Sequence, residues 1–142
     1  MLVLNGPNLN LLGGRQPQVY GHDTLDDVAS RCRTLGAELG LTVRFAQSNH
    51  EGELIELIHQ AHAAGAALLI NPAGYGHTSV ALRDAVTMLA GPKVEVHISN
   101  VHAREEFRHH SYLSAVVDAV IIGAGVHGYE LGIRHIASVR NR

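Results

Sequence analysis

Apolar runs rich in β-branched residues alternate along the chain with segments whose apolar residues recur every three or four positions. The first pattern is typical of buried strands and the second of amphipathic helices. The expected strands are residues 2–4, 41–46, 66–70, 94–98 and 119–122. Such alternation predicts a parallel sheet that is covered by helices on both faces and joined by right-handed crossovers.

Four helices are expected between and after these strands. Thr24 and Asp27 form a capping-box pattern before the first, whose apolar positions are Leu25, Val28, Ala29, Cys32, Leu35 and Leu39. The second has Gly65 as its stop and carries Leu54, Leu57, Ile58 and Ala61 on one face. Residues 79–90 and 129–139 are the third and the last.

The chain of 142 residues is expected to form one domain around one core. With five strands, the commonest doubly wound order is 2-1-3-4-5, and ligands then bind at the carboxyl ends of the strands, where the winding reverses. The loops after strands one, three and four (residues 5–21, 71–79 and 99–108) should meet there.

The fourth strand, "KVEVHISN", carries an unusual polar stripe. Side chains alternate across a strand, so Glu95, His97 and Ser99 face away from its three apolar residues. A carboxylate two positions from a histidine can fix the histidine tautomer and favour its protonated form. A central strand would make this pair a candidate general acid or base, whereas an edge strand would make it a solvated face. The pattern alone leaves both open.

The segment "NPAGYGHTSVALRDA" follows the third strand. Thr78 or Ser79 can cap the next helix, whose first-turn N–H groups favour an anion, with His77 as a further hydrogen-bonding group. A plain capped helix after a glycine-rich turn explains the segment equally well. Asn71, at the strand end, offers an amide that can donate to and accept from substrate hydroxyls.

The loop "GGRQPQVYG" holds an arginine and a tyrosine five positions apart, Arg15 and Tyr20. Free tyrosine has a pKa of about 10, and a guanidinium beside it favours the phenolate. We expect a mobile lid at about residues 12–21 that brings base and activator together when it closes.

Composition and charge exclude several classes of function. A net charge of −2 and the lack of a basic cluster argue against nucleic-acid binding. The first apolar run is too short for a signal peptide or a membrane span. The single cysteine, Cys32, cannot form an internal disulfide, which favours the reducing cytoplasm.

Two further patterns suggest cofactors. "GAGVHG", residues 123–128, matches a dinucleotide fingerprint, but only residues 129–142 follow it, without the required strand and acidic residue. Close helix–strand packing is the preferred reason for these glycines. The histidines lack an H-E-x-x-H motif or dense Cys/His spacing, so no metal is expected; those considered are His59, His62, His97, His102, His109 and His110.

Five segments together resemble type II 3-dehydroquinate dehydratase, a small flavodoxin-like enzyme of the shikimate and quinate pathways: "NGPNLNLLG", "QVYG", "HTSVALRDA", "EVHISNVHAREEFRHHSYLS" and "GYELGIRH". The likeness runs nearly end to end, and the fourth segment is the most specific. It implies a three-layer αβα fold and a cofactor-free anti elimination of water from 3-dehydroquinate, through an enolate, to 3-dehydroshikimate. A flavodoxin-like nucleotide-binding module and a metal-dependent hydrolase are the alternatives.

The resemblance also implies catalytic roles. Tyr20 matches the proton acceptor for the C2 proton, and Arg15 matches the lid arginine that activates the tyrosine and stabilises the transition state. His97 matches the acid that protonates the leaving C1 hydroxyl, and Glu95 matches its orienting partner. Asn8 matches the residue that helps to hold a water against the enolate oxygen.

Further positions match substrate-binding residues of the family: Asn71, His77, Ile98, Ser99 and Arg108, with backbone N–H contacts at Ile98 and Ser99. Asp84 matches a residue contributed to a neighbour's site, which implies a homododecamer built from trimers. Arg104 lies in the most specific segment and is expected to support the site.

One observation and three departures accompany the resemblance. Lys93, the chain's single lysine, precedes the fourth strand at the end of the sheet opposite the three loops, so an imine route is implausible on geometry. Gln16 stands where relatives usually carry glutamate, and Gly74 and Gly76 alter the turn after Asn71. These departures are expected to affect the lid and turnover rather than the reaction.

Overall fold

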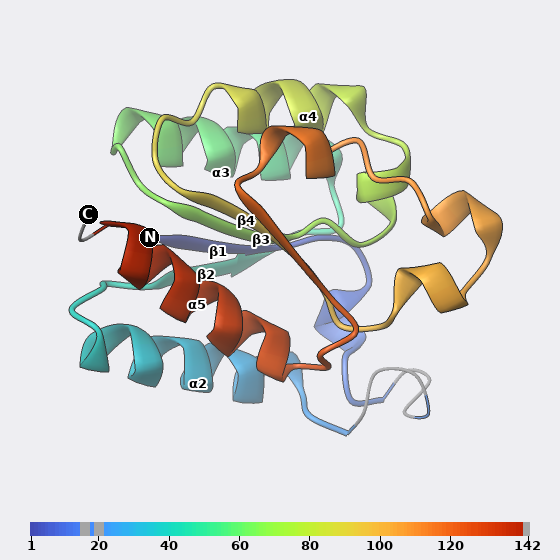
Figure 1. Cartoon of the computed structure of the whole chain (residues 1–142), viewed down its shortest axis with the longest axis horizontal. Coiled ribbons are helices and arrows are strands. Elements are labelled where there is room, and N and C mark those ends of the chain that lie inside the picture. Colours follow the sequence, from blue (N-terminus) through green and yellow to red (C-terminus); the bar gives the residue numbers. More distant parts are fainter. Residues whose placement is uncertain (15–17, 19–21, 141–142) are drawn as a thin grey trace.

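The computed structural model describes residues 1–14, 18 and 22–140. Its sheet has five parallel strands in the order β2-β1-β3-β4-β5, which confirms the doubly wound order expected from the sequence (Figure 1). The strands are β1 Leu2–Asn5, β2 Arg44–Gln47, β3 Leu68–Asn71, β4 Lys93–His97 and β5 Ala119–Ile122. The longer helices are α2 Leu25–Glu38, α3 Glu51–Ala63, α4 Val80–Thr87 and α5 His127–Arg140.

The helices form two layers around the sheet. Figure 1 shows α2 and α5 on one face and α3 and α4 on the other. Strand alternation supplies both cores, since Val3 packs with the α2 and α5 side chains while Leu2 and Leu4 pack with those of α3 and α4. Both faces of β1 are therefore buried, as in other sheets covered on two sides.

The expected helix signals are confirmed. Thr24 and Asp27 form a reciprocal capping box at the start of α2. Gly65 has a positive φ of 58° directly after the end of α3, a conformation that glycine adopts without a Cβ penalty. Ser79 caps α4 by accepting a hydrogen bond from the Leu82 N–H.

Several boundaries differ from the expected ones. Strand β2 begins at Arg44 rather than at residue 41, because Leu41 closes the turn after α2 by donating to the Gly36 carbonyl. Strand β4 ends at His97, and α4 ends at Thr87 because the following N–H groups of Met88 and Leu89 bond three residues back. Strand β3 begins two residues later than expected, and α5 begins two residues earlier.

The winding reverses between β1 and β3, whose last residues, Asn5 and Asn71, are register partners. Short 3-10 helices occupy the loops beyond this edge: η1 Leu9–Leu11, η2 Ala73–His77, η3 Val101–Ala103, η4 Glu106–Arg108 and η5 Ser114–Val116. The loops after β1, β3 and β4 thus converge where expected. Among the described helices, none is both long and apolar enough to cross a bilayer.

Candidate active site

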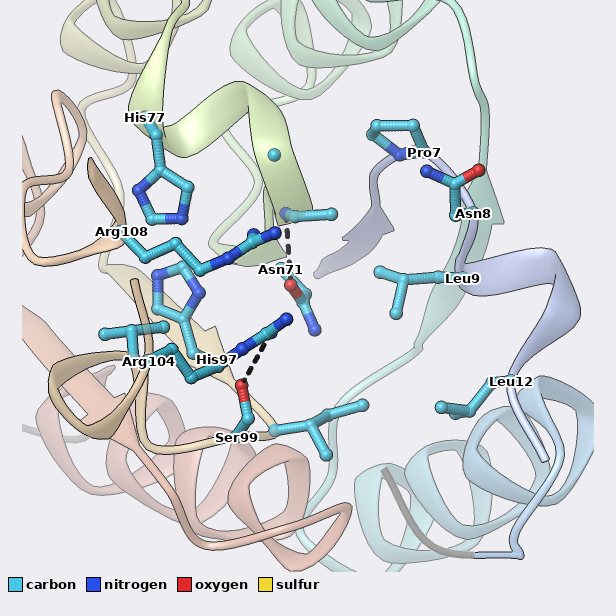
Figure 2. A pocket seen from close by; sticks show the side chains of 14 residues that line it. Pro7, Asn8, Leu9, Leu12, Asn71, His77, His97, Ser99, Arg104 and Arg108 are labelled. Atoms are coloured by element: carbon cyan, nitrogen blue, oxygen red, sulfur yellow. Dashed lines mark hydrogen bonds between the residues drawn. The ribbon is translucent and has the colours of Figure 1, made fainter. Parts of the chain in front are cut away.

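A cavity of about 150 Å³ opens at the C-terminal edge of the sheet, between the loops after β1, β3 and β4 (Figure 2). The structure brings eight of the residues singled out in the sequence to its wall: Asn8, Asn71, His77, His97, Ile98, Ser99, Arg104 and Arg108. These residues are far apart in the chain, so the doubly wound topology is what assembles the site.

Glu95 and His97 form a buried hydrogen-bonded pair on one face of β4. His97 Nε2 lies 2.7 Å from Glu95 Oε1, and the side-chain exposures are 6% and 0%. Strand β4 lies between β3 and β5, so the interpretation of the polar stripe as a solvated edge is wrong. Because a carboxylate only accepts, Nε2 carries a hydrogen and the ring is held in one orientation.

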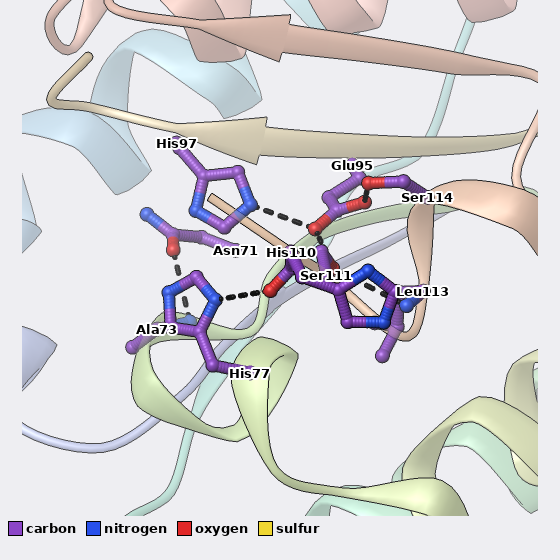
Figure 3. Close-up of polar contacts among 9 residues, drawn as sticks. All are labelled: Asn71, Ala73, His77, Glu95, His97, His110, Ser111, Leu113 and Ser114. Carbon is purple, nitrogen blue, oxygen red and sulfur yellow. Dashed lines mark hydrogen bonds and ion pairs between the residues drawn. The ribbon is translucent and has the colours of Figure 1, made fainter. Parts of the chain in front are cut away.

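The Glu95 carboxylate is also bound by two serines from the segment between β4 and β5 (Figure 3). The Ser111 hydroxyl donates to Oε1 and the Ser114 hydroxyl donates to Oε2, each at 2.6 Å. Burial by itself raises the pKa of this carboxyl, but the hydrogen bonds from His97, Ser111 and Ser114 outweigh burial and hold the pKa below its ordinary value. Glu95 is therefore ionised at neutral pH despite its burial.

A second histidine, His77, faces His97 across the cavity. The rings are stacked, with centroids 6.0 Å apart and an interplanar angle of 18°. His77 Nδ1 lies 2.8 Å from the His110 carbonyl, which only accepts, so Nδ1 carries the hydrogen (Figure 3). Burial lowers the pKa of His77 and outweighs the hydrogen bond to the His110 carbonyl, which raises it. The neutral ring then presents Nε2 as an acceptor.

The loop after β4 adds positive charge to the cavity wall. Arg104 donates to the Ser99 hydroxyl at 3.3 Å, and Arg108 donates to the Glu105 carboxylate at 2.9 Å. Glu105 also pairs with Arg104 at 3.6 Å. Figure 2 shows both guanidinium groups beside His97 and Asn71. Two guanidinium groups at one small cavity suit a ligand with a carboxylate.

Asn8 lines the opposite wall of the cavity. Its backbone is left-handed, with φ at 69°, which asparagine tolerates better than most residues. Its N–H donates to Asn49 Oδ1 at 2.9 Å, and Gln47 Nε2 donates to the same oxygen. The turn is thus tied to the end of β2, while the Asn8 side chain lies at the cavity.

Four predicted site residues are not among the described residues that line the cavity, and one of them is Glu95, which is fully buried on β4 and bonded to His97. Arg15 and Tyr20, with most of the expected lid, lie outside the described residues. Asp84 is exposed on α4 and does not reach the cavity of its own chain. Lys93 begins β4, and its Nζ donates to the Leu89 carbonyl at the far end of the sheet.

The "GAGVHG" loop packs against β4, and its backbone N–H groups at Gly123 and Gly125 are already hydrogen-bonded. The Gly123 and Gly125 N–H groups donate to the His97 and Ile98 carbonyls, so they are not available to a pyrophosphate. A Cβ on Gly128 would lie 2.9 Å from Val96 Cγ2, which confirms close helix–strand packing as the reason for this glycine. Within the described part of the chain, no group of three His, Cys, Asp or Glu side chains is placed to hold a metal.

Sequence reasoning assigned no role to Ser111, Ser114, Glu105 or Tyr129. Tyr129 is fully buried on α5 and bonds to both Asn5 and Asn71. A tyrosine in an apolar helix face is a usable signal, because its buried hydroxyl requires a polar partner. The serines lie within the most specific segment, but a contact to Glu95 across 16 or 19 residues has no local pattern.

Comparison with known proteins agrees with the fold. The sequence pattern of the family "Dehydroquinase class II" matches residues 1–137. The chain is 57% identical over 137 residues to 3-dehydroquinate dehydratase of Cereibacter sphaeroides, covering 96% of this chain and 93% of that protein. It is 56% identical over 140 residues to the enzyme of that name from Streptomyces avermitilis, covering 98% and 88%. The crystal structure of type II dehydroquinase from Propionibacterium acnes superposes with a TM-score of 0.95 at 49% identity, covering 97% and 95%.

Proposed function

The chain belongs to the class II dehydroquinase family, and on that premise we propose that it removes water from 3-dehydroquinate by anti elimination through an enolate, giving 3-dehydroshikimate. The observation that carries this proposal is the buried Glu95–His97 pair at the end of a central strand, which opens onto a cavity walled by cations and amides. No cofactor takes part in the proposed reaction.

The cavity wall matches the polar groups of this substrate. Arg108 and His77 supply a cation and a hydrogen-bonding ring for the carboxylate and hydroxyl groups. Asn71 and Ser99 offer further donors and acceptors, and the backbone N–H groups at Ile98 and Ser99 complete the proposed set. Arg104 holds the Ser99 hydroxyl and supports this wall.

The first chemical step is removal of the C2 proton by the Tyr20 phenolate. Arg15 keeps Tyr20 ionised and stabilises the developing charge. The electron pair of the C–H bond moves to the neighbouring carbonyl, so that its oxygen becomes an enolate oxygen. A water held with the help of Asn8 donates to that oxygen. Arg15 and Tyr20 enter this step through the family match, because they lie outside the described residues.

The second step is loss of the C1 hydroxyl, with His97 as general acid. His97 Nε2–H is held by Glu95, so the other ring nitrogen of the imidazolium is the one that gives its proton to the leaving group. As the enolate returns its electron pair, the C1–O bond breaks and water leaves. Tyr20 has gained one proton and His97 has lost one, and their exchange with solvent restores the enzyme.

The proposed enzyme is an oligomer of the cytoplasm. Val80 and Asp84 share one face of α4, and Met88, which follows the end of the helix, continues that face; Val80 and Met88 are 54% and 50% exposed. Exposed apolar residues that lie together on one face are suited to a protein interface. We propose that α4 docks against a second copy, places Asp84 at that copy's site and forms the trimer of a dodecamer. The same dehydration serves aromatic biosynthesis and quinate breakdown, and the proposal covers both.

The assay follows the ultraviolet absorbance of the conjugated enone product after addition of 3-dehydroquinate, with and without a chelator. We expect turnover that the chelator does not change. Tyr20→Phe and His97→Ala are each expected to lower kcat by about 10²–10⁴-fold, the usual range for one acid or base. Absence of product would refute the proposed function, and loss of rate with the chelator would favour a metal-dependent reaction.

A further inference from the structure

One buried hydroxyl, that of Tyr129, joins the ends of the two strands between which the winding reverses. Tyr129 lies on α5 and has 0% exposure. Its hydroxyl donates to Asn5 Oδ1 at 2.7 Å and accepts from Asn71 Nδ2 at 3.0 Å. Asn5 and Asn71 end β1 and β3 and are register partners. Helix α5 thus contacts the site through a polar group as well as through the core.

The direction of each hydrogen bond in this chain is fixed by backbone groups at its two ends. Asn5 Nδ2 donates to the Ala46 carbonyl at 3.0 Å, so Asn5 Oδ1 must accept from Tyr129. The Tyr129 hydroxyl, having donated its hydrogen, must accept from Asn71 Nδ2. At the far end, Asn71 Oδ1 accepts from the Ala73 N–H at 3.2 Å. Burial raises the pKa of Tyr129, so the hydroxyl keeps this hydrogen.

This chain selects one of the two amide orientations of Asn71. An amide flipped by 180° would set its nitrogen against the Ala73 N–H and its oxygen against the Tyr129 hydroxyl oxygen, whose hydrogen is committed to Asn5. Both contacts would be repulsive. In the observed orientation, the second N–H and the second lone pair of Asn71 remain for a ligand at the cavity that Asn71 lines.

We infer that Tyr129 is a positioning residue for substrate binding, because its hydroxyl holds the Asn71 amide in the orientation that meets the substrate hydroxyls. This inference rests on the proposed function. Tyr129 and Asn5 are both absent from the described lining of the cavity, so their effect must pass through Asn71. Their removal should therefore affect the affinity for substrate more than the chemical step.

The test is a double-mutant cycle with Tyr129→Phe and Asn71→Ala, in which kcat and KM for 3-dehydroquinate are measured for all four proteins. Tyr129→Phe alone should raise KM by about 10-fold, because the Asn71 amide is then held by the Ala73 N–H alone and its flipped orientation is less disfavoured, and should change kcat by less than about 3-fold. In the Asn71→Ala background, the same change should alter kcat/KM by less than about 2-fold. If Tyr129→Phe lowers kcat/KM by the same factor with and without Asn71, the inference is wrong.

Two further variants separate positioning from loss of stability. Ile136→Val removes a methyl group from the same face of α5, where Ile136 is 0% exposed, and should lower Tm without raising KM. Asn5→Ala leaves the Tyr129 hydrogen uncommitted, so it should raise KM as Tyr129→Phe does, and it serves if Tyr129→Phe does not fold. An unchanged KM in Asn5→Ala, or a raised KM in Ile136→Val, would contradict the inference. Inactive wild-type protein would instead refute the proposed function.

Discussion

At the scale of single residues, the serine contacts of Glu95 set the pH range in which the Glu95–His97 pair can act. Ser114→Ala removes the donor to Oε2. A hydrogen bond to a charged group is worth about 1.5–3 kcal/mol, and 1.36 kcal/mol corresponds to about one pKa unit. The pKa of Glu95 should therefore rise in the variant, and the acidic limb of the pH profile of kcat/KM should move to higher pH.

The hydrogen bond between Ser114 and Glu95 also affects how the stability of the fold depends on pH. The folded state holds the pKa of Glu95 below its ordinary value. The ionised carboxylate therefore stabilises the fold at pH values above the ordinary pKa, and this stabilisation is lost as the pH falls through the pKa of the folded state. Ser114→Ala should therefore lower the unfolding free energy by about 1.5–3 kcal/mol at neutral pH. Ser138→Ala is the matched control, because the Ser138 hydroxyl donates to the His135 carbonyl on the surface of α5. Identical pH profiles for Ser114→Ala and wild type would contradict this role.

His77 gives a second, separate pH dependence. Its pKa is held below the ordinary value by burial, so the unfolded chain binds this proton first as pH falls. Wild-type stability should therefore decrease as pH falls below about 6.5. The variant His77→Asn lacks the titrating ring, so its stability lacks this dependence on pH. The asparagine side-chain N–H can still donate to the His110 carbonyl. The difference in Tm between wild type and variant should narrow from about pH 7.5 to about pH 5.5. A constant difference would show that His77 does not titrate in this way.

At the scale of elements, the packing of α5 on β4 explains the glycine loop that resembles a nucleotide fingerprint. Gly128→Ala would place a Cβ 2.9 Å from Val96 Cγ2 in a buried central strand. Overpacking of this kind costs about 1–3 kcal/mol, which lowers Tm by roughly 3–10 °C. Gly52→Ala on α3 is the control, since nothing lies within 4 Å of its added Cβ. If Gly128→Ala and Gly52→Ala change Tm by the same amount, close packing is not the reason for Gly128.

The helices and strands also show which features of the fold could be predicted from the sequence. Strands and helix faces followed from apolar periodicity, because each buried face repeats along a single segment, as Val94 and Val96 do in β4. The strand order followed instead from the commonest doubly wound arrangement of five strands. The capping pair Thr24 and Asp27 was equally local. The contacts of Glu95 with Ser111 and Ser114 could not be predicted this way, because they depend on how the segment after β4 folds back over the strand.

The strand limits missed by two or three residues have a similar cause. An apolar residue beside a strand, such as Leu41, is buried whether it pairs with a neighbour or closes a turn. The hydrophobic pattern indicates which residues are buried but not which groups they hydrogen-bond to, so it does not locate the end of a strand. Site residues at strand ends were easier to predict, since Asn71 and His97 are polar where apolar residues are expected.

At the scale of the whole molecule, the exposed face of α4 bears on the proposal that a neighbouring copy completes the site. Asp84 lies on that face between Val80 and Met88 and is not part of the described lining of its own cavity. If Asp84 serves a neighbouring copy, the enzyme needs an oligomer to act. Sedimentation of the wild type should then show an assembly larger than a dimer, and Asp84→Ala should lower activity while the assembly remains.

Complementation between the variants Asp84→Ala and His97→Ala tests this arrangement directly. Asp84→Ala keeps His97, and His97→Ala keeps Asp84, so a mixed oligomer can pair an intact His97 with an intact Asp84 from the neighbouring subunit. Co-refolding the two variants in equal amounts should restore about a quarter of wild-type activity, because half of the sites keep His97 and half of their neighbours supply Asp84. Each variant refolded alone is the control. If Asp84 acts within its own chain, no mixed site contains both groups and activity does not recover.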